Sequence, residues 1–226
     1  MTRILSSAQR EYLNVQMNKV SRSFSLVAPE VDAPLDDYLA VAYLICRVVD
    51  NIEDARQPFF WQKKRYAEFA WLLDAPHTAG NVLAEWETYD WPGLSDDEQR
   101  MMTREGGLLL WDIYATMPHS VCISIKLSTS AMAEGMARTN NPDEENFFIE
   151  RNGVRMPATY SDYNEYCFYV AGTVGRMISD LASEHYAING AAAKALARDS
   201  EYCGRALQKT NIVKDFAKDL DRGAAF

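Results

Sequence analysis

Two pairs of aspartates, each spaced four residues apart, lie within long segments of helical pattern. Asp50 and Asp54 end an apolar segment, and Asp215 and Asp219 lie near the end of the sequence. On an α-helix this spacing places both carboxylates of a pair on one face, one turn apart. Like charges at that spacing repel, so we expect a cation between them. Mg²⁺ prefers oxygen ligands and is commonly held by a few carboxylates together with phosphate oxygens. Two such helices facing each other would form a site for a metal-bound diphosphate.

The pattern of apolar residues and helix caps predicts an all-α protein. Helices are expected from Ser6–Ser7 onward, Leu35 to about Arg56, Trp61–Leu73, Ser95 to about Ala115, Ser120–Arg138, Tyr160–His185 and Gly190–Leu220. The second of these is apolar nearly all round and is therefore expected to be buried. Asn152-Gly153 is a strong two-residue hairpin signal, and it predicts a surface hairpin between Phe147 and Thr159. The polar residues Glu150, Arg151 and Arg155 suit its exposed face.

Composition limits the class of protein. A chain of 226 residues, 48% of them hydrophobic, can bury a large core, and we expect one domain over residues 1–226. The net charge of −9 disfavours nucleic acid as a partner. The four cysteines show no C-x-x-C spacing, so we expect reduced thiols and a cytoplasmic protein. Neither a signal peptide nor a segment long enough to span a bilayer is evident, so any membrane contact is expected to be peripheral.

The first acidic pair belongs to a longer polar stripe. Tyr43, Arg47, Asp50 and Asp54 step by four, three and four residues, and Glu53 lies beside them. Polar groups inside an apolar helix are costly unless they are paired. The stripe therefore indicates either a metal site or a structural ion-pair set around Arg47, and the helix alone leaves both interpretations open.

The second acidic pair also extends into a stripe, formed by Gln208, Asn211, Asp215 and Asp219. All four side chains present oxygen atoms on one helical face, and Lys214 beside them could contact phosphate. A solvated, charged helix end is the alternative, because mixtures of Asp and Lys are ordinary there. Two oxygen-bearing stripes in one chain together favour the metal site.

A glycine-bearing segment, Tyr166–Gly175, is the third unusual feature. Gly172 and Gly175 lower helix stability by about 1 kcal/mol each relative to alanine. Small residues allow either another helix backbone or an apolar ligand to approach closely. The sequence alone does not distinguish helix packing from ligand binding at these glycines.

Four segments in this order resemble the squalene/phytoene synthase family: Ser21–Phe24, Cys46–Asp54, Tyr166–Gly175 and Gln208–Asp215. The resemblance extends from about Ser21 to Arg222 and is closer to squalene synthases than to phytoene synthases. It implies an isoprenoid-synthase helical bundle with a central cavity. It also implies Mg²⁺-dependent head-to-head condensation of two farnesyl diphosphates through presqualene diphosphate, followed by NADPH reduction to squalene. Family members continue beyond this point with further helices, so the chain is expected to be incomplete at its C-terminus.

The resemblance also implies roles for individual residues. The metal ligands would be Asp50, Glu53, Asp54, Asn211, Asp215 and Asp219. The substrate-binding residues would be Ser21, Ser23, Phe24, Tyr43, Arg47, Gln208 and Lys214. Arg22 and Arg47 match positions tied to NADPH. Tyr166 matches a tyrosine proposed to assist proton removal, and it would act in catalysis with Arg47 and the four paired aspartates.

The sequence also allows three alternative functions. A head-to-head synthase that stops early would make phytoene, dehydrosqualene or presqualene diphosphate without NADPH. A head-to-tail prenyltransferase is disfavoured, because the Asp-Asp-x-x-Asp run typical of that class is absent. A non-catalytic assembly protein need not keep both acidic stripes. We therefore expect a monomeric enzyme whose partner is farnesyl diphosphate.

Overall fold

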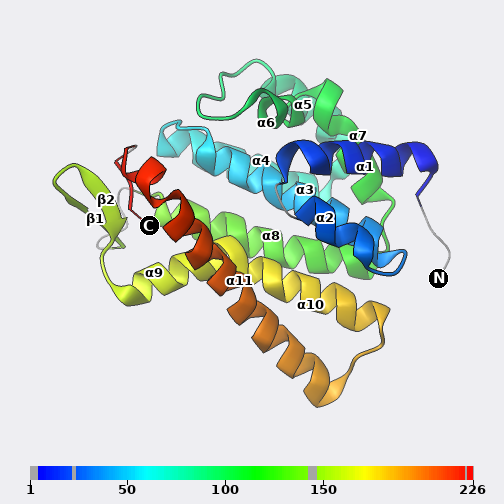
Figure 1. Ribbon diagram of the computed structural model, residues 1–226. Coiled ribbons are helices and arrows are strands. Elements are labelled where there is room, and N and C mark those ends of the chain that lie inside the picture. Colours follow the sequence, from blue (N-terminus) through cyan, green and yellow to red (C-terminus); the bar gives the residue numbers. More distant parts are fainter. Residues whose placement is uncertain (1–4, 22–23, 142–146, 222, 226) are drawn as a thin grey trace. The chain divides into compact units, whose positions relative to one another are not determined.

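A computed structural model describes residues 5–21, 24–141, 147–221 and 223–225. These residues form helices and one two-stranded sheet (Figure 1). The chain divides into two compact units, Met1–Thr129 and Ser130–Phe226, and each is described by itself. The expected single domain stays a prediction. None of the helices in the described ranges is long and apolar enough to cross a membrane.

The first unit is built around one buried helix, α3 (Leu35–Asp54). It packs against α1 (Ser7–Val20), α4 (Phe59–Asp74), α6 (Asp96–Met101) and α7 (Arg104–Ala115). The predicted burial is confirmed. The remaining elements are α2 (Phe24–Val27), η1 (Ala28–Glu30), η2 (Pro76–Thr78), α5 (Ala79–Trp86) and the start of α8 (His119–Thr139).

The single helix predicted from Ser95 to about Ala115 is wrong, because the chain turns between α6 and α7. Thr103 caps the second helix, its hydroxyl accepting a hydrogen bond from the Gly106 amide at 3.2 Å. A Cβ atom on Gly106 would lie 2.1 Å from the Arg100 carbonyl oxygen. The turn therefore needs a glycine at this close backbone approach.

The second unit contains the rest of α8, β1 (Phe148–Arg151), β2 (Val154–Pro157) and α9 (Tyr160–Cys167). A π-helical turn, η3 (Phe168–Gly172), leads directly into α10 (Thr173–His185), and α11 (Gly190–Leu220) follows. The helical runs predicted over 160–185 and 190–220 are confirmed. The hairpin is confirmed as well, with Asn152 and Gly153 at φ 54° and 78° and Arg151 paired with Val154.

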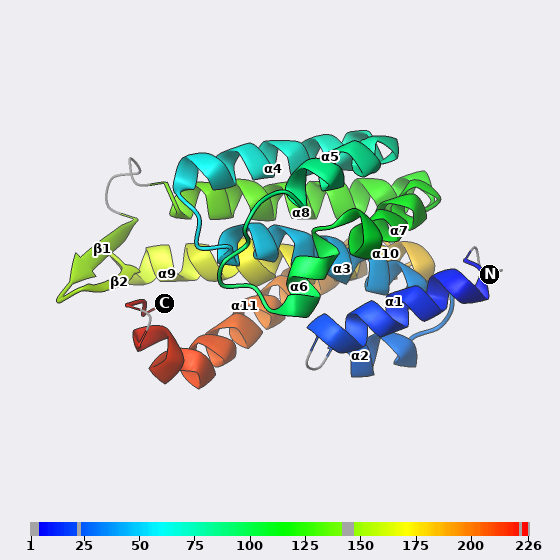
Figure 2. The same cartoon turned by 90° about the horizontal axis from the view of Figure 1, so that it is seen from above.

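Arg155 is not the exposed hairpin residue that the sequence predicts. Its backbone pairs with the segment after α11, with N–O distances of 2.8 Å to Gly223 and 2.8 Å to Ala225. Its guanidinium donates to the Thr139 carbonyl oxygen at 2.6 Å and lies 4.3 Å from the centre of the Phe148 ring. The last described residues therefore lie beside the hairpin (Figure 2).

The glycines of the Tyr166–Gly175 segment lie where this segment packs against α11. A Cβ atom on Gly175 would lie 2.1 Å from the Ser200 carbonyl oxygen, and one on Gly204 would lie 2.2 Å from that of Ala171. The backbones of α10 and η3 therefore pack directly on α11. Of the two uses that the sequence leaves open, the structure shows backbone packing at these positions.

Candidate active site

The polar stripe on α3 forms one connected set of side chains. The Tyr43 hydroxyl donates a hydrogen bond to the Val20 carbonyl oxygen at 3.2 Å. Arg47 Nη2 donates to the Tyr43 hydroxyl oxygen at 3.2 Å, and Arg47 Nη1 lies 3.5 Å from Asp50 Oδ2. The residues of the predicted stripe from Tyr43 to Asp50 are therefore linked to one another by side-chain contacts.

The electrostatics of Asp50 favour a bound cation. Burial raises the pKa of Asp50 to about 6; Arg47 opposes this shift, while Asp54 and Glu98 add to it. At neutral pH the carboxylate is therefore ionised in surroundings that penalise its charge. An added divalent cation would relieve that penalty.

The Arg47 guanidinium keeps one N–H donor that no described residue accepts from. Burial opposes its charge, but the Asp50 charge, Tyr43 and Glu98 together raise the pKa of Arg47 above its ordinary value. Its Nε atom is buried and has no hydrogen-bond partner among the described residues. A buried donor of this kind suits an anionic oxygen, such as one of a diphosphate.

Ser21, before α2, and Phe24, the first residue of α2, are two further predicted residues beside this stripe. Ser21 Oγ accepts hydrogen bonds from the amides of Phe24 at 2.9 Å and Ser25 at 3.2 Å, and so holds the start of α2. The Phe24 ring stacks on Tyr43, with centroids 5.1 Å apart and planes at 12°. Ser21, Phe24, Tyr43 and Arg47 thus lie together. Ser23 and Arg22 fall outside the described residues.

The acidic turn itself closes α3. Glu53 is half-buried and Asp54 is exposed. From α4, Gln62 Nε2 donates to the backbone oxygens of Ile52 at 3.2 Å and Glu53 at 2.9 Å, so the end of α3 is held in place.

Sequence reasoning missed Glu98, which comes to this site from α6. Its Oε1 atom lies 3.8 Å from Arg47 Nη1. The Ser95-to-Glu98 capping pattern is visible in the sequence as the start of a helix. Nothing in that pattern shows that the helix start returns to Arg47.

The second stripe lies on α11 in the other unit. Gln208, Asp215 and Asp219 are half-buried, whereas Asn211 and Lys214 are exposed. These residues share one helix, as the spacing predicts. That this stripe faces the Asp50 stripe across one cavity stays a prediction.

Tyr166 lies in a small core against α11. It is 8% exposed and belongs to an apolar cluster with Phe147, Cys167 and Ile212. Its ring meets that of Phe148 edge-on, with centroids 6.1 Å apart. Ile212 is the neighbour of Asn211 in the sequence, so Tyr166 packs beside the helix that carries the second stripe.

Each aspartate pair is chemically suited to Mg²⁺. In the part of the chain that the structure describes, no three acidic, histidine or cysteine side chains converge into a metal cluster. Mg²⁺ is usually bound through one or two carboxylates, with phosphate oxygens and water completing its shell. The half-buried, ionised Asp50 and the spare donor of Arg47 fit this mode of binding.

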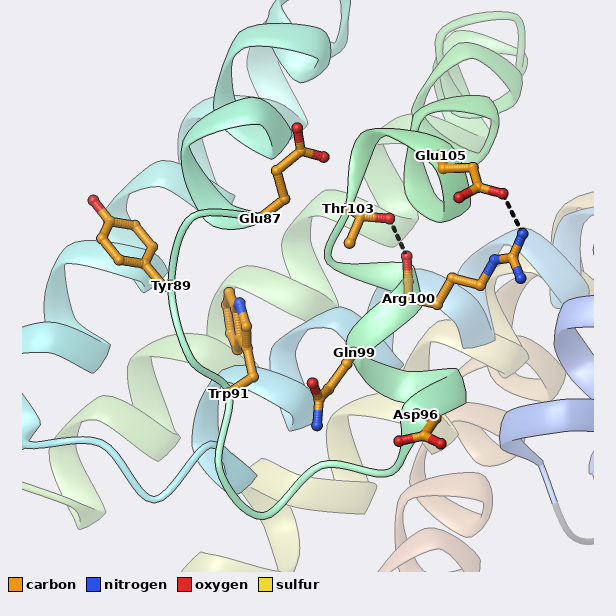
Figure 3. A pocket seen from close by; sticks show the side chains of 8 residues that line it. All are labelled: Glu87, Tyr89, Trp91, Asp96, Gln99, Arg100, Thr103 and Glu105. Atoms are coloured by element: carbon orange, nitrogen blue, oxygen red, sulfur yellow. Dashed lines mark hydrogen bonds and ion pairs between the residues drawn. The ribbon is translucent and has the colours of Figure 1, made fainter.

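A pocket of about 340 Å³ lies elsewhere in the first unit, between the segment after α5 and the α6–α7 turn (Figure 3). It is lined by Glu87, Tyr89, Trp91, Asp96, Gln99, Arg100, Thr103 and Glu105. None of the predicted site residues that the structure describes lines it. Arg100 pairs with Glu105, and Glu87 accepts a hydrogen bond from the Arg104 amide at 3.1 Å. Three of its four charged groups therefore have partners within the local structure.

Comparisons with known proteins identify the family of the chain. Residues 17–226 match the family described as squalene/phytoene synthase. A squalene synthase of Candida albicans is 31% identical over 215 residues, covering 93% of this chain and 43% of the relative. One of Dictyostelium discoideum is 26% identical over 220 residues, covering 96% and 46%. The chain thus spans less than half the length of these relatives.

A solved structure supports the fold. The complex of TcSQS with the ligand BPH1237 matches with a TM-score of 0.72 and 24% identity, covering 95% of this chain and 55% of that one. The predicted all-α fold is confirmed.

Proposed function

Because the chain belongs to the squalene/phytoene synthase family, we propose that it catalyses head-to-head condensation of two farnesyl diphosphates to squalene, through presqualene diphosphate. The observation that carries the proposal is the connected set of Tyr43, Arg47 and Asp50 on the buried helix α3, with Phe24 of α2 stacked on Tyr43. It combines aromatic faces, a cation with spare donors and an acid that favours a metal ion.

The two acidic stripes and Arg47 would have separate roles in the ionisation of an allylic diphosphate. Asp50, Glu53 and Asp54 would hold Mg²⁺, with Asn211, Asp215 and Asp219 providing the second set of ligands. Bound Mg²⁺ supplies charge that stabilises the departing diphosphate. Arg47 would donate to the diphosphate oxygens from its spare nitrogen, as preorganised electrostatic catalysis requires.

The remaining predicted residues would act on the prenyl groups and on the anion. Phe24 and Tyr43 present stacked rings next to Arg47, and such ring faces stabilise a nearby carbocation. Ser21 and Ser23 would order the segment over the diphosphate, while Gln208 and Lys214 would contact it from α11. An apolar enclosure would protect the cation from water.

Tyr166 would take part in the proton loss that closes the cyclopropane ring of presqualene diphosphate. Its hydroxyl would pass the proton to a diphosphate oxygen. NADPH would supply the hydride for the second half-reaction, with Arg22 and Arg47 binding its phosphate groups. The proposal includes a cytoplasmic monomer whose contact with membrane is peripheral and serves product release. Free thiols at Cys46, Cys122, Cys167 and Cys203 are consistent with a reducing compartment.

Product analysis tests the proposal directly. The purified chain is incubated with farnesyl diphosphate and Mg²⁺, with and without NADPH, and the products are separated by chromatography and mass spectrometry. We expect presqualene diphosphate without NADPH and squalene with it. Phytoene-type or dehydrosqualene products would instead assign an early-stopping synthase. Binding of Mg²⁺ and farnesyl diphosphate without any turnover would contradict catalysis by this chain and favour a binding or assembly role.

A further inference from the structure

Glu98 takes part in two interactions, the N-terminal cap of α6 and an ion pair with Arg47. Its Oε2 atom accepts hydrogen bonds from the Ser95 amide at 2.9 Å and the Ser95 hydroxyl at 2.7 Å, which completes the capping box of α6. Its other oxygen, Oε1, lies 3.8 Å from Arg47 Nη1. The cap therefore fixes the carboxylate in an orientation that leaves one oxygen toward Arg47.

A second link fixes the start of α6 to the same turn of α3. The side chain of Asn51, the residue after Asp50, is fully buried, and its Nδ2 atom donates to the Glu98 carbonyl oxygen at 3.3 Å. The position of Glu98 relative to Arg47 and Asp50 is thus set by backbone contact as well as by charge.

Arg47 is shared between two carboxylates. The same Nη1 atom lies 3.5 Å from Asp50 Oδ2 and 3.8 Å from Glu98 Oε1. Both distances exceed those of a well-formed N–H···O hydrogen bond, so neither carboxylate holds the guanidinium exclusively. Nη2 is meanwhile anchored on the Tyr43 hydroxyl. A small rotation of the guanidinium would move Nη1 from one acid to the other.

We propose that Glu98 is a positioning residue that holds Arg47 as an alternative counter-ion and so leaves Asp50 available to a metal ion. This inference rests on the proposed function, because it assumes that Asp50 binds Mg²⁺. Without Glu98, Asp50 would be the remaining acid partner of Nη1 among the described residues, and the guanidinium would compete with the cation for it. With Glu98, the Arg47 charge stays compensated when Mg²⁺ takes Asp50.

The test is the affinity for Mg²⁺ in the presence of saturating inorganic pyrophosphate, measured by isothermal titration calorimetry. Glu98→Gln removes the charge but keeps a residue that can complete a capping box. Asp97→Asn is the matched control, since Asp97 lies in the same helical turn and pairs with Lys19 at 3.1 Å. We expect the Mg²⁺ Kd to rise about three- to fivefold in Glu98→Gln, at the upper end of the range for exposed ion pairs because both side chains are half-buried, and less than twofold in Asp97→Asn.

A double variant separates positioning from bulk charge. In an Arg47→Gln background, Glu98→Gln should change the Mg²⁺ Kd less than twofold, because Glu98 acts through Arg47. An equal effect in both backgrounds, or no effect in either, would overturn the inference. Equal binding by the wild type and Asp50→Asn would instead overturn the proposed metal site itself. Thermal melts would verify that each variant is folded.

Discussion

Replacing Asp50 with asparagine should stabilise the metal-free protein, and the gain should grow with pH. In the folded state burial raises the pKa of Asp50 to about 6, whereas an unfolded aspartate titrates near 3.9. Between these values the folded protein binds more protons than the unfolded chain. The stability of the wild type therefore falls as pH rises through this window. Asparagine has no proton to lose, so the variant lacks this fall.

The size of the effect follows from the shift. Two pKa units correspond to about 3 kcal/mol when Asp50 is fully ionised in the folded state, and linkage leaves about half of that at pH 5. The Asp50 side chain is 23% exposed, so solvent screening reduces both figures. We expect the stability difference between Asp50→Asn and the wild type to increase by about 1 kcal/mol from pH 5 to pH 7.5.

Urea denaturation with EDTA present, at pH 5, 6 and 7.5, measures this difference. Asp112→Asn is the control, because Asp112 is exposed on α7 and its replacement changes net charge equally. A gain independent of pH would refute the assignment of the raised pKa to Asp50. A loss of stability at pH 7.5 would show that the Asp50–Arg47 contact is a structural ion pair.

Three other predictions concern the second unit. Tyr166→Phe should lower presqualene diphosphate formation at least tenfold in single-turnover assays while costing about 1 kcal/mol of stability; near wild-type formation would exclude the proton-transfer role. Gly175→Ala should destabilise the protein by about 2–4 kcal/mol in urea titrations, because its Cβ would lie 2.1 Å from the Ser200 carbonyl oxygen; an unchanged midpoint would mean that α10 and α11 can separate at no cost. Deleting Asn152-Gly153 should speed amide exchange around the hairpin and leave farnesyl diphosphate affinity within about threefold; a large loss of affinity would place the hairpin at the substrate site.

The local sequence pattern was enough to predict the two helices that carry the acidic pairs. The first begins at Leu35 as predicted, because Pro34 precedes it and its residues are apolar nearly all round. The second has the predicted bounds, Gly190–Leu220. In both, the residues that decide the structure are neighbours in the sequence, so spacing alone reveals a shared face.

Features that depend on tertiary contact could not be read in this way. The turn at Thr103 is set by how closely Gly106 approaches the preceding helix, and a periodic pattern does not record that distance. Arg155 looks like a solvent-facing strand residue until the segment near Gly223 pairs with it. Glu98 reads as a helix cap, and only the fold brings it to Arg47.

The π-helical turn between α9 and α10 determines which face of α10 lies on the same side as a given face of α9. Its backbone bond runs from the Thr173 amide to the Phe168 carbonyl, one residue further than in an α-helix. Each residue in a helix advances the chain by about 100°. If the same residues formed an ordinary α-helix, the face of Gly175 would turn by about that angle relative to Tyr166, although every side chain would still be present. A one-residue deletion within Phe168–Gly172 would leave an α-helical turn and should keep Gly175 against α11, whereas a one-residue insertion after Gly172 would turn it away.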